Sequence, residues 1–271
     1  GSTETARAIN RTLAGRDGPI ATLIAETGGQ NAMIVDSTAL PEQVVRDVVR
    51  SSFTSAGQRC SALRVLFVQN DVASKTIDML TGAMAELTVG DPGLLSTDVG
   101  PVIDEDALAM LRRHQALMDA EAQVVRKLPL GAETAYGTFF APAAYEIDGI
   151  LALEGEVFGP ILHVVRYDDA RLDAVIDDIN RTGFGLTVSV HSRIDATVEH
   201  IRSRLRVGNM YVNRNQIGAV VGVQPFGGEG LSGTGPKAGG PHYLYRFAVE
   251  RSLSVDTTAS GGNAALLNLE E

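Results

Sequence analysis

Short apolar runs alternate along this chain with amphipathic stretches of helical spacing. In residues 41–55, Pro41 stands at the start and valines recur on one stripe, as in a helix that packs on a core. Strands separated by helices of this length favour βαβ units, so we expect an α/β fold with a mostly parallel sheet flanked by helices and with functional residues on loops at the strand ends. The predicted strands are 32–35, 63–68, 122–126, 161–166, 186–191 and 209–212, and the predicted helices are 41–55, 72–87, 105–120, 172–179 and 196–205.

The pattern changes after residue 212. Residues 224–241 are rich in glycine, which predicts a long loop. Residues 247–255 then alternate Ala, Val and Leu with Glu, Arg and Ser, which predicts an isolated strand that needs a sheet edge in this chain or in another one.

Composition narrows the class of protein. With 271 residues, 44% of them hydrophobic, the chain has room for a sizeable core. The net charge is −10 and the basic residues are scattered, so a nucleic-acid surface is not expected. The single cysteine excludes an internal disulfide and fits a reducing, cytoplasmic location. No apolar run approaches the roughly 18 residues of a membrane span, and the five histidines lack the spacing of metal ligands.

Cys60 is the first candidate for chemistry. A lone cysteine is most often a small buried hydrophobic residue. Here, however, Gly57, Gln58, Arg59 and Ser61 surround it, which is a polar loop rather than a core. A neighbouring cation lowers a thiol pKa and raises the fraction of thiolate, the form that a covalent nucleophile needs.

Three further segments carry weaker signals. Glu26 precedes a Gly-Gly turn and a buried strand, which suits either a solvated carboxylate or a general base. Glu154 and Glu156 stand two apart before the strand that starts at residue 161, in an exposed turn or in a paired-carboxylate site. Residues 228–233 match G-x-G-x-x-G, but no βαβ unit follows, so conformational freedom is favoured over a phosphate cradle.

Together these segments resemble the aldehyde dehydrogenase superfamily, in order and spacing along nearly the whole chain. The resemblance rests on residues 1–4 (GSTE), 26–30 (ETGGQ), 57–60 (GQRC), 156–160 (EVFGP), Asn213 and 225–228 (PFGG). Residues 26–31, Ser61 and the segment 217–222, called the anchor loop below, are similar to the L-glutamate γ-semialdehyde (1-pyrroline-5-carboxylate) dehydrogenase branch. Residues 235–243 and 254–258 most resemble the C-terminal part of the bifunctional proline utilization A family, in which a proline dehydrogenase with bound FAD lies upstream.

The resemblance implies a role for individual residues. Cys60 attacks the aldehyde, hydride leaves to NAD, and Glu26 activates the water that releases the acid. Glu156 and Phe158 hold the nicotinamide riboside, and Gly1 and Ser2 lie near the cofactor pyrophosphate.

The resemblance also implies a substrate site. Backbone N–H groups of Gly218 and Ala219 and the Ser61 hydroxyl bind the substrate α-carboxylate, while Phe226 packs on its aliphatic part. Some members carry Ser where this chain has Ala219, so one side-chain donor is absent here.

Finally, the resemblance implies a division of the chain. We expect a remnant of the NAD-binding Rossmann domain at 1–25, the catalytic domain at 26–212, a Gly-rich substrate-anchor and late loop region at 213–245, and an oligomerisation strand with a C-terminal tail at 246–271. Most of the NAD-binding domain then lies outside these residues, and we expect little NAD-dependent activity from the chain alone. The alternatives are another semialdehyde dehydrogenase of the superfamily and a non-catalytic oligomerisation fragment.

Overall fold

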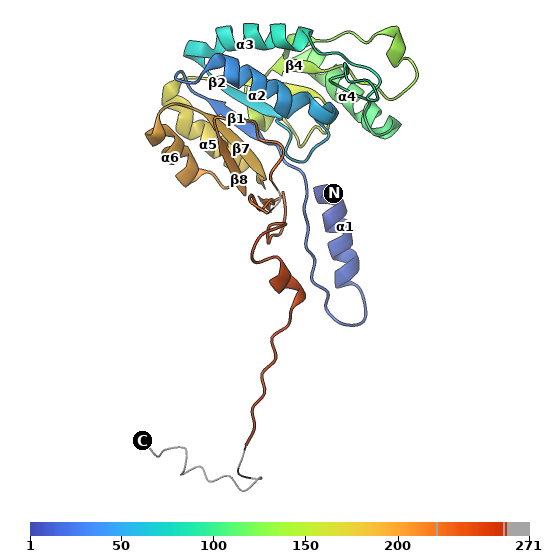
Figure 1. Ribbon diagram of the computed structural model, residues 1–271, viewed down its shortest axis with the longest axis vertical. Helices are drawn as coiled ribbons and strands as arrows, with labels where there is room; N and C mark the ends of the chain where they lie inside the picture. The colour runs from blue at the N-terminus through green and yellow to red at the C-terminus, as the bar shows by residue number, and fades with distance from the viewer. Residues whose placement is uncertain (221, 257, 259–271) are drawn as a thin grey trace.

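A seven-stranded sheet forms the centre of the protein (Figure 1). The structure is a computed structural model, and it describes residues 1–220, 222–256 and 258. The strand order is β3-β4-β5-β2-β1-β7-β8, and all neighbours are parallel except β3 and β4. The strands are β1 (Ala32–Val35), β2 (Val65–Gln69), β3 (Gln123–Lys127), β4 (Ala143–Glu146), β5 (Ile161–Tyr167), β7 (Thr187–His191) and β8 (Asn209–Val212), with a separate pair of β6 (Phe184–Gly185) and β9 (Glu229–Gly230).

Helices cover both faces of this sheet, as a parallel sheet requires. The helices are α1 (Thr3–Ala14), α2 (Pro41–Phe53), α3 (Asn70–Ala85), α4 (Glu105–Glu121), α5 (Leu172–Arg181) and α6 (Asp195–Arg204). In Figure 1, α2 and α3 lie side by side, and α5 and α6 lie on the opposite face of the sheet. The central strands β1, β2 and β7 are buried along their whole length, so the core lies on both sides of them.

The predicted fold class is confirmed, and every predicted helix and strand up to residue 212 is present with ends within two residues. The sequence analysis did not predict α1, β4 or the two-residue strands β6 and β9. The strand β4 is only four residues long and leaves a weak periodic signal, whereas α1 is amphipathic in sequence but buries none of its residues. In Figure 1, α1 stands away from the sheet, beside the segment that leads to β1.

The strand predicted at 247–255 does not form within the described part of this chain, and its pairing with another chain stays a prediction. A short 3-10 helix, Leu244–Phe247, ends there, and the backbone from 248 to 256 is unpaired and points away from the body of the protein (Figure 1). Its apolar side chains are exposed, with Val249 91% and Leu253 88% accessible. A strand needs backbone partners, and the described part of the chain offers none to this segment. The rest of the predicted tail, residues 257 and 259–271, lies outside the described residues.

The parallel arrangement brings the candidate residues together at the amino-terminal ends of the strands. Glu26 precedes β1, Cys60 precedes β2 and Glu156 precedes β5, so all three lie toward the amino-terminal ends of neighbouring strands. The chain reaches the other ends of the strands at Asn213, after β8, and then returns, because Gln216 bonds to the backbone carbonyl of Ser61. The sheet thus brings segments from across the sequence to the nucleophile.

Two findings bear on the expectations from composition. Within the described ranges, no helix is long and apolar enough to cross a membrane. The same residues contain no group of three or more His, Cys, Asp or Glu side chains arranged to hold a metal ion.

Candidate active site

The loop that carries Cys60, the nucleophile loop (residues 54–62), has an unusual backbone. Within its 3-10 turn, Thr54–Gly57, three successive residues have positive φ: 57° at Ser55, 53° at Ala56 and 65° at Gly57. A Cβ on Gly57 would lie 2.2 Å from the carbonyl oxygen of Gly159, so only glycine fits without displacement of the backbone. The tight left-handed turn ends α2 and places Cys60 before β2.

Two buried side chains hold this loop from below. Asn31 donates from Nδ2 to the carbonyl oxygens of Cys60 at 2.6 Å and of Ala62 at 2.9 Å. Arg64 donates from Nη1 to Gly57 O at 2.7 Å and from Nη2 to Arg59 O at 3.2 Å. Both side chains are almost inaccessible to solvent, so these bonds fix the loop to the core.

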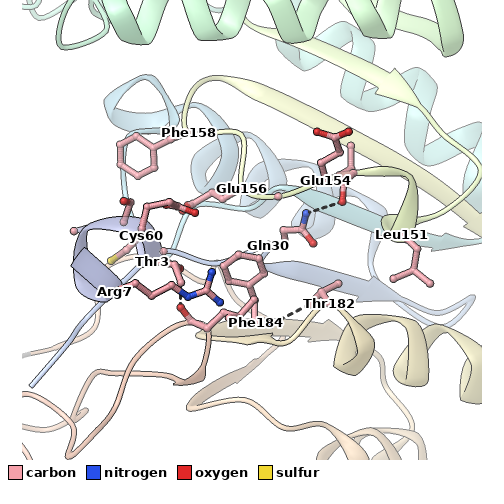
Figure 2. Close-up of a pocket in the computed structure, with 17 residues that line it drawn as sticks. Thr3, Arg7, Gln30, Cys60, Leu151, Glu154, Glu156, Phe158, Thr182 and Phe184 are labelled. Atoms are coloured by element: carbon pink, nitrogen blue, oxygen red, sulfur yellow. Dashed lines mark hydrogen bonds between the residues drawn. The ribbon is translucent and has the colours of Figure 1, made fainter. Parts of the chain in front are cut away.

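The Cys60 thiol faces a cavity of about 760 Å³ (Figure 2). Its walls include the first residues of the chain, Cys60 of the nucleophile loop, and the segment before β5 (residues 151–158), called the β5-side loop below. Its volume lies in the range of small-molecule and cofactor sites. Of the predicted site residues, Gly1, Ser2, Cys60, Glu156 and Phe158 line this cavity.

The environment of Cys60 reverses one expectation. Burial raises the pKa of the Cys60 thiol, and the Glu156 carboxylate and then that of Glu26 push in the same direction. Backbone N–H groups of Ser61 and Cys60 bond to the sulfur and oppose them. The residue is exposed through the cavity mouth, yet protein around the sulfur displaces water from it. Arg59, the cation expected to lower the thiol pKa, instead bonds to Ser55 Oγ at 3.3 Å.

Glu26 is one of two carboxylates that act on the Cys60 thiol, and it is not part of the cavity lining. It forms an antiparallel bridge with Gly233, so the Gly-rich loop pairs with its backbone. Its Oε1 is buried and has no hydrogen-bond partner among the described residues. Burial raises the pKa of the Glu26 carboxyl, although the nearby Lys237 ammonium partly offsets this.

Glu156 is the second carboxylate at the thiol. It accepts a bond from Arg64 Nη2 at 3.1 Å, and a Cβ on Gly28 would lie 1.6 Å from its Oε2. Burial raises the pKa of the Glu156 carboxyl, against the attraction of the Arg64 cation. The Phe158 ring lies 5.2 Å from the Arg64 guanidinium carbon and is 36% exposed toward the cavity. These contacts join the β5-side loop to the nucleophile loop.

The predicted substrate residues lie outside this cavity lining. Ser61 is buried, and its carbonyl oxygen accepts from Gln216 Nε2 at 3.4 Å, which links it to the start of the anchor loop. Gly218 has a φ of 71° and is exposed, and Ala219 is partly buried beside it. Phe226 is held by an antiparallel bridge to Ala238. Gln216 therefore connects Ser61 to the start of the anchor loop, and among the described residues no hydrogen bond joins the Ser61 side chain to this loop.

Sequence reasoning missed three residues that build the site: Asn31, Arg64 and Gln216. Arg64 had a detectable signal, because an arginine inside an apolar strand must be paired when it is buried. Asn31 and Gln216 are amides next to apolar segments, and nothing in the sequence shows which carbonyls they reach. Gln216 is fully buried, and its Oε1 has no partner among the described residues.

Comparison with known proteins defines the class. Residues 1–252 match the model of the aldehyde dehydrogenase family, so the chain belongs to that family. The resemblance expected from the motifs is thereby confirmed.

Among its relatives are bifunctional enzymes of proline metabolism. The chain is 56% identical over 262 residues to the bifunctional protein PutA of Escherichia coli (strain K12), across 94% of this chain and 20% of that protein. It is 37% identical over 236 residues to the 1-pyrroline-5-carboxylate dehydrogenase of Geobacillus kaustophilus (strain HTA426), across 86% of this chain and 45% of that protein. The chain thus spans about a fifth of the length of the PutA relatives.

The chain is also similar in fold to solved structures with the same names as these relatives. A mutant of Bradyrhizobium japonicum proline utilization A (PutA) is 60% identical with a TM-score of 0.91, over 96% of this chain and 26% of that one. A 1-pyrroline-5-carboxylate dehydrogenase from Thermus with bound NAD is 33% identical with a TM-score of 0.81, over 91% of this chain and 48% of that one.

Proposed function

We propose that this chain supplies the catalytic part of an NAD-dependent L-glutamate γ-semialdehyde dehydrogenase, with Cys60 as the nucleophile. The observation that carries the proposal is the position of the only thiol, which faces a 760 Å³ cavity that Glu156 also lines. In the first step the sulfur forms a bond to the aldehyde carbon, the C=O π bond breaks, and the proton released by the thiol goes to the aldehyde oxygen to give a thiohemiacetal. The Cys60 N–H group, which already faces the sulfur, supports the negative charge that develops on that oxygen.

The residues around the cavity fit the nicotinamide end of a dinucleotide. Glu156 offers carboxylate oxygens to ribose hydroxyls, and the exposed face of Phe158 offers an apolar surface. Ser2 caps α1, whose N-terminal N–H groups border the cavity and suit a pyrophosphate. When bound, NAD supplies the acceptor for the hydride that leaves the thiohemiacetal. Cys60 then carries the product as a thioester.

Glu26 is proposed as the base that releases the product. A water molecule attacks the thioester, its proton passes to the Glu26 carboxylate, the C–S bond breaks, and the acid leaves with the thiol restored. The raised pKa of Glu26 supports this role, since a base of higher pKa takes a proton more readily. Its buried Oε1, without a hydrogen-bond partner among the described residues, is available to a water molecule. A carboxylate in this position favours hydrolysis over acyl transfer to a thiol cofactor.

Glutamate γ-semialdehyde is proposed as the substrate. The anchor loop supports this, because the backbone N–H groups of Gly218 and Ala219 with the Ser61 hydroxyl can bind an α-carboxylate without a basic patch. Phe226 would contact the aliphatic part of the substrate. A relative named 1-pyrroline-5-carboxylate dehydrogenase is 37% identical over 236 residues of this chain. The alternative is another semialdehyde dehydrogenase of the same family.

The proposal includes two partners, an upstream proline dehydrogenase and a second subunit. The PutA relatives are bifunctional, so we infer a proline dehydrogenase, with its own FAD, upstream in the protein that contains this chain. We infer that the unpaired segment 248–256 becomes a strand when it adds to the sheet edge of a partner subunit. The 271-residue chain alone is expected to form little or no NADH, since the chain spans about a fifth of these relatives.

Kinetics of the full-length protein test the proposal. Cys60→Ala should abolish NADH formation from 1-pyrroline-5-carboxylate. Glu26→Gln should keep a burst of about one NADH per site and then stall, because the thioester forms but is not hydrolysed. Glu199→Gln, an exposed charge on α6, is the matched control and should retain the normal rate.

The outcomes separate the alternatives. A normal steady-state rate for Cys60→Ala would refute the nucleophile. Equal rates for aldehydes with and without an α-amino acid end would favour a different semialdehyde. A full-length protein that oxidises no aldehyde would favour the non-catalytic oligomerisation fragment, and rapid NADH formation by the 271-residue chain would contradict its predicted inactivity.

A further inference from the structure

We propose that Asn31 and Arg64 are positioning residues of the nucleophile loop: each holds the carbonyl of one peptide next to Cys60, so that the N–H group of the same peptide faces the Cys60 sulfur. The inference concerns how the chain prepares its nucleophile, and it rests on the proposed function. Neither residue touches the substrate cavity as a reacting group. Both act through the backbone of the loop.

The first peptide joins Arg59 and Cys60. In a planar trans peptide, C=O and N–H point in opposite directions, so a fixed carbonyl fixes the N–H as well. Arg64 Nη2 donates to Arg59 O at 3.2 Å, and the N–H of Ala62 donates to the same oxygen at 3.0 Å. The Cys60 N–H is therefore turned away from Arg64 and toward the sulfur, with which it forms a hydrogen bond.

The second peptide joins Cys60 and Ser61. Asn31 Nδ2 donates to Cys60 O at 2.6 Å, which directs the Ser61 N–H to the opposite side. That N–H also bonds to the Cys60 sulfur. Two consecutive N–H groups thus converge on one atom, as in the concave backbone sites that bind anions.

Both side chains are themselves fixed, which is what positioning requires. Asn31 Oδ1 accepts the N–H of Thr187 at 3.2 Å, so strand β7 orients the amide. Arg64 Nη1 bonds to Gly57 O at 2.7 Å and Gly159 O at 3.1 Å, and the side chain is 1% exposed. Asn31 supplies the hydrogen-bond donor recorded for Cys60 O, whereas Arg59 O is shared between Arg64 and the N–H of Ala62.

This arrangement answers an electrostatic problem of the site. Burial and two carboxylates, Glu156 and Glu26, disfavour the thiolate of Cys60. The two N–H groups are the contacts that favour it. A loop whose peptides were free to rotate would lose that compensation, so the thiolate would become rarer at neutral pH.

Alkylation of Cys60 as a function of pH tests the proposal. Cys60 is the only cysteine, so iodoacetamide reports this one thiol in the 271-residue chain. Asn31→Leu removes the amide donor, and Arg64→Lys keeps the cation but loses the fork of donors. Asn180→Leu is the matched control, because Asn180 also bridges two backbone groups, Arg204 O and the N–H of Arg206, away from the loop.

We expect the alkylation rate at pH 7.5 to fall about three- to tenfold in Asn31→Leu and Arg64→Lys, since one hydrogen bond to the charged sulfur is weakened in each. The plateau rate at high pH, where all of the thiol is ionised, should stay within about twofold of the unaltered chain. Asn180→Leu should match the unaltered chain at every pH. Overlapping pH profiles for all folded variants, or a rate lowered equally at every pH, would overturn the proposal.

A second measurement does not depend on the variants folding. In the unaltered chain, the amide protons of Cys60 and Ser61 should shift in NMR spectra as the thiol titrates, by more than that of Ala62. Amide shifts that ignore the titration would overturn the proposal. Neither measurement requires an aldehyde or NAD, so failure of the proposed function and failure of this inference can be told apart.

Discussion

Replacement of Gly57 by alanine should destabilise the protein strongly. The residue has a φ of 65°, and the left-handed conformation costs a residue with a Cβ about 1–2 kcal/mol. The added Cβ would lie 2.2 Å from Gly159 O and 2.9 Å from Ser52 O, both backbone atoms that cannot rotate away. Overpacking of this kind typically costs a further ~1–3 kcal/mol.

The sum, about 2–5 kcal/mol, is a large part of the roughly 5–15 kcal/mol that stabilises an ordinary domain. At about 2–4 °C per kcal/mol for a protein of this size, the melting temperature should fall by about 4–20 °C. Circular dichroism of the chain during heating measures the change. The same variant should also alter alkylation of Cys60, since Gly57 lies in the nucleophile loop.

Gly82→Ala is the matched control for this prediction. Gly82 lies inside α3 and is exposed, and a Cβ there would meet nothing within 4 Å. The same substitution should therefore stabilise the chain by about 0.5–1 kcal/mol through helix propensity. The steric reasoning would be refuted if the melting temperature of Gly57→Ala lay within about 2 °C of that of the unaltered chain. It would also be refuted if Gly82→Ala melted at a lower temperature than Gly57→Ala.

Three further predictions concern buried polar groups. Burial lowers the pKa of His163 to about 3, below the ~6.5 of a free imidazole. Between these two pH values the unfolded chain binds a proton that the folded chain does not. The folded state therefore loses stability as the pH falls below about 6.5. At pH 5 this amounts to about 2 kcal/mol, and His163→Phe should flatten the pH dependence of the urea midpoint; an unchanged slope would count against it. Glu156→Gln should lower the pKa of the Cys60 thiol and speed its alkylation at pH 7.5, with a smaller effect in the same direction for Glu26→Gln, whereas slower alkylation would contradict the repulsion. Tyr145→Phe removes a 2.8 Å hydrogen bond to a carboxylate on α4 and should cost about 1.5–3 kcal/mol in chemical denaturation, and a loss below about 0.5 kcal/mol would show that the bond is not formed.

The sequence by itself determined most of the secondary structure. The helix α2 begins at Pro41 and buries Val44, Val45 and Val48, because a period near 3.6 places them on one face. The four apolar residues of β1 were predictable as a strand buried on both faces. Local pattern suffices for such elements, since the side chains that specify them lie within one or two turns of each other.

Pairing with distant partners was beyond the reach of local pattern. The alternation at 247–255 is that of a strand, yet the segment forms no ladder in the described part of the chain. A strand forms only when backbone groups of another strand accept its hydrogen bonds. The pattern predicts the capacity to pair, and the tertiary or quaternary structure decides whether pairing occurs.

The candidate site divides in the same way. Motifs predicted Cys60, Glu26 and Glu156, and their roles stay predictions, but the pattern did not show that the amino-terminal edge of one parallel sheet gathers them. In the sequence, Arg64 is a charged residue next to an apolar strand. In the fold it donates hydrogen bonds to the carbonyl oxygens of Gly159 and Arg59 and so connects two loops. Those contacts span up to 95 positions in sequence, so only the folded chain reveals them.

The sign of the Cys60 pKa shift was decided by tertiary structure alone. The sequence placed a cation, Arg59, next to the thiol and so favoured a lowered value. In the fold that cation turns to Ser55, while burial and the carboxylate of Glu156 raise the pKa. Desolvation and Coulomb energy depend on the distances between groups in the folded protein and on the local dielectric. Residues that are adjacent in sequence can have side chains that lie far apart in the fold.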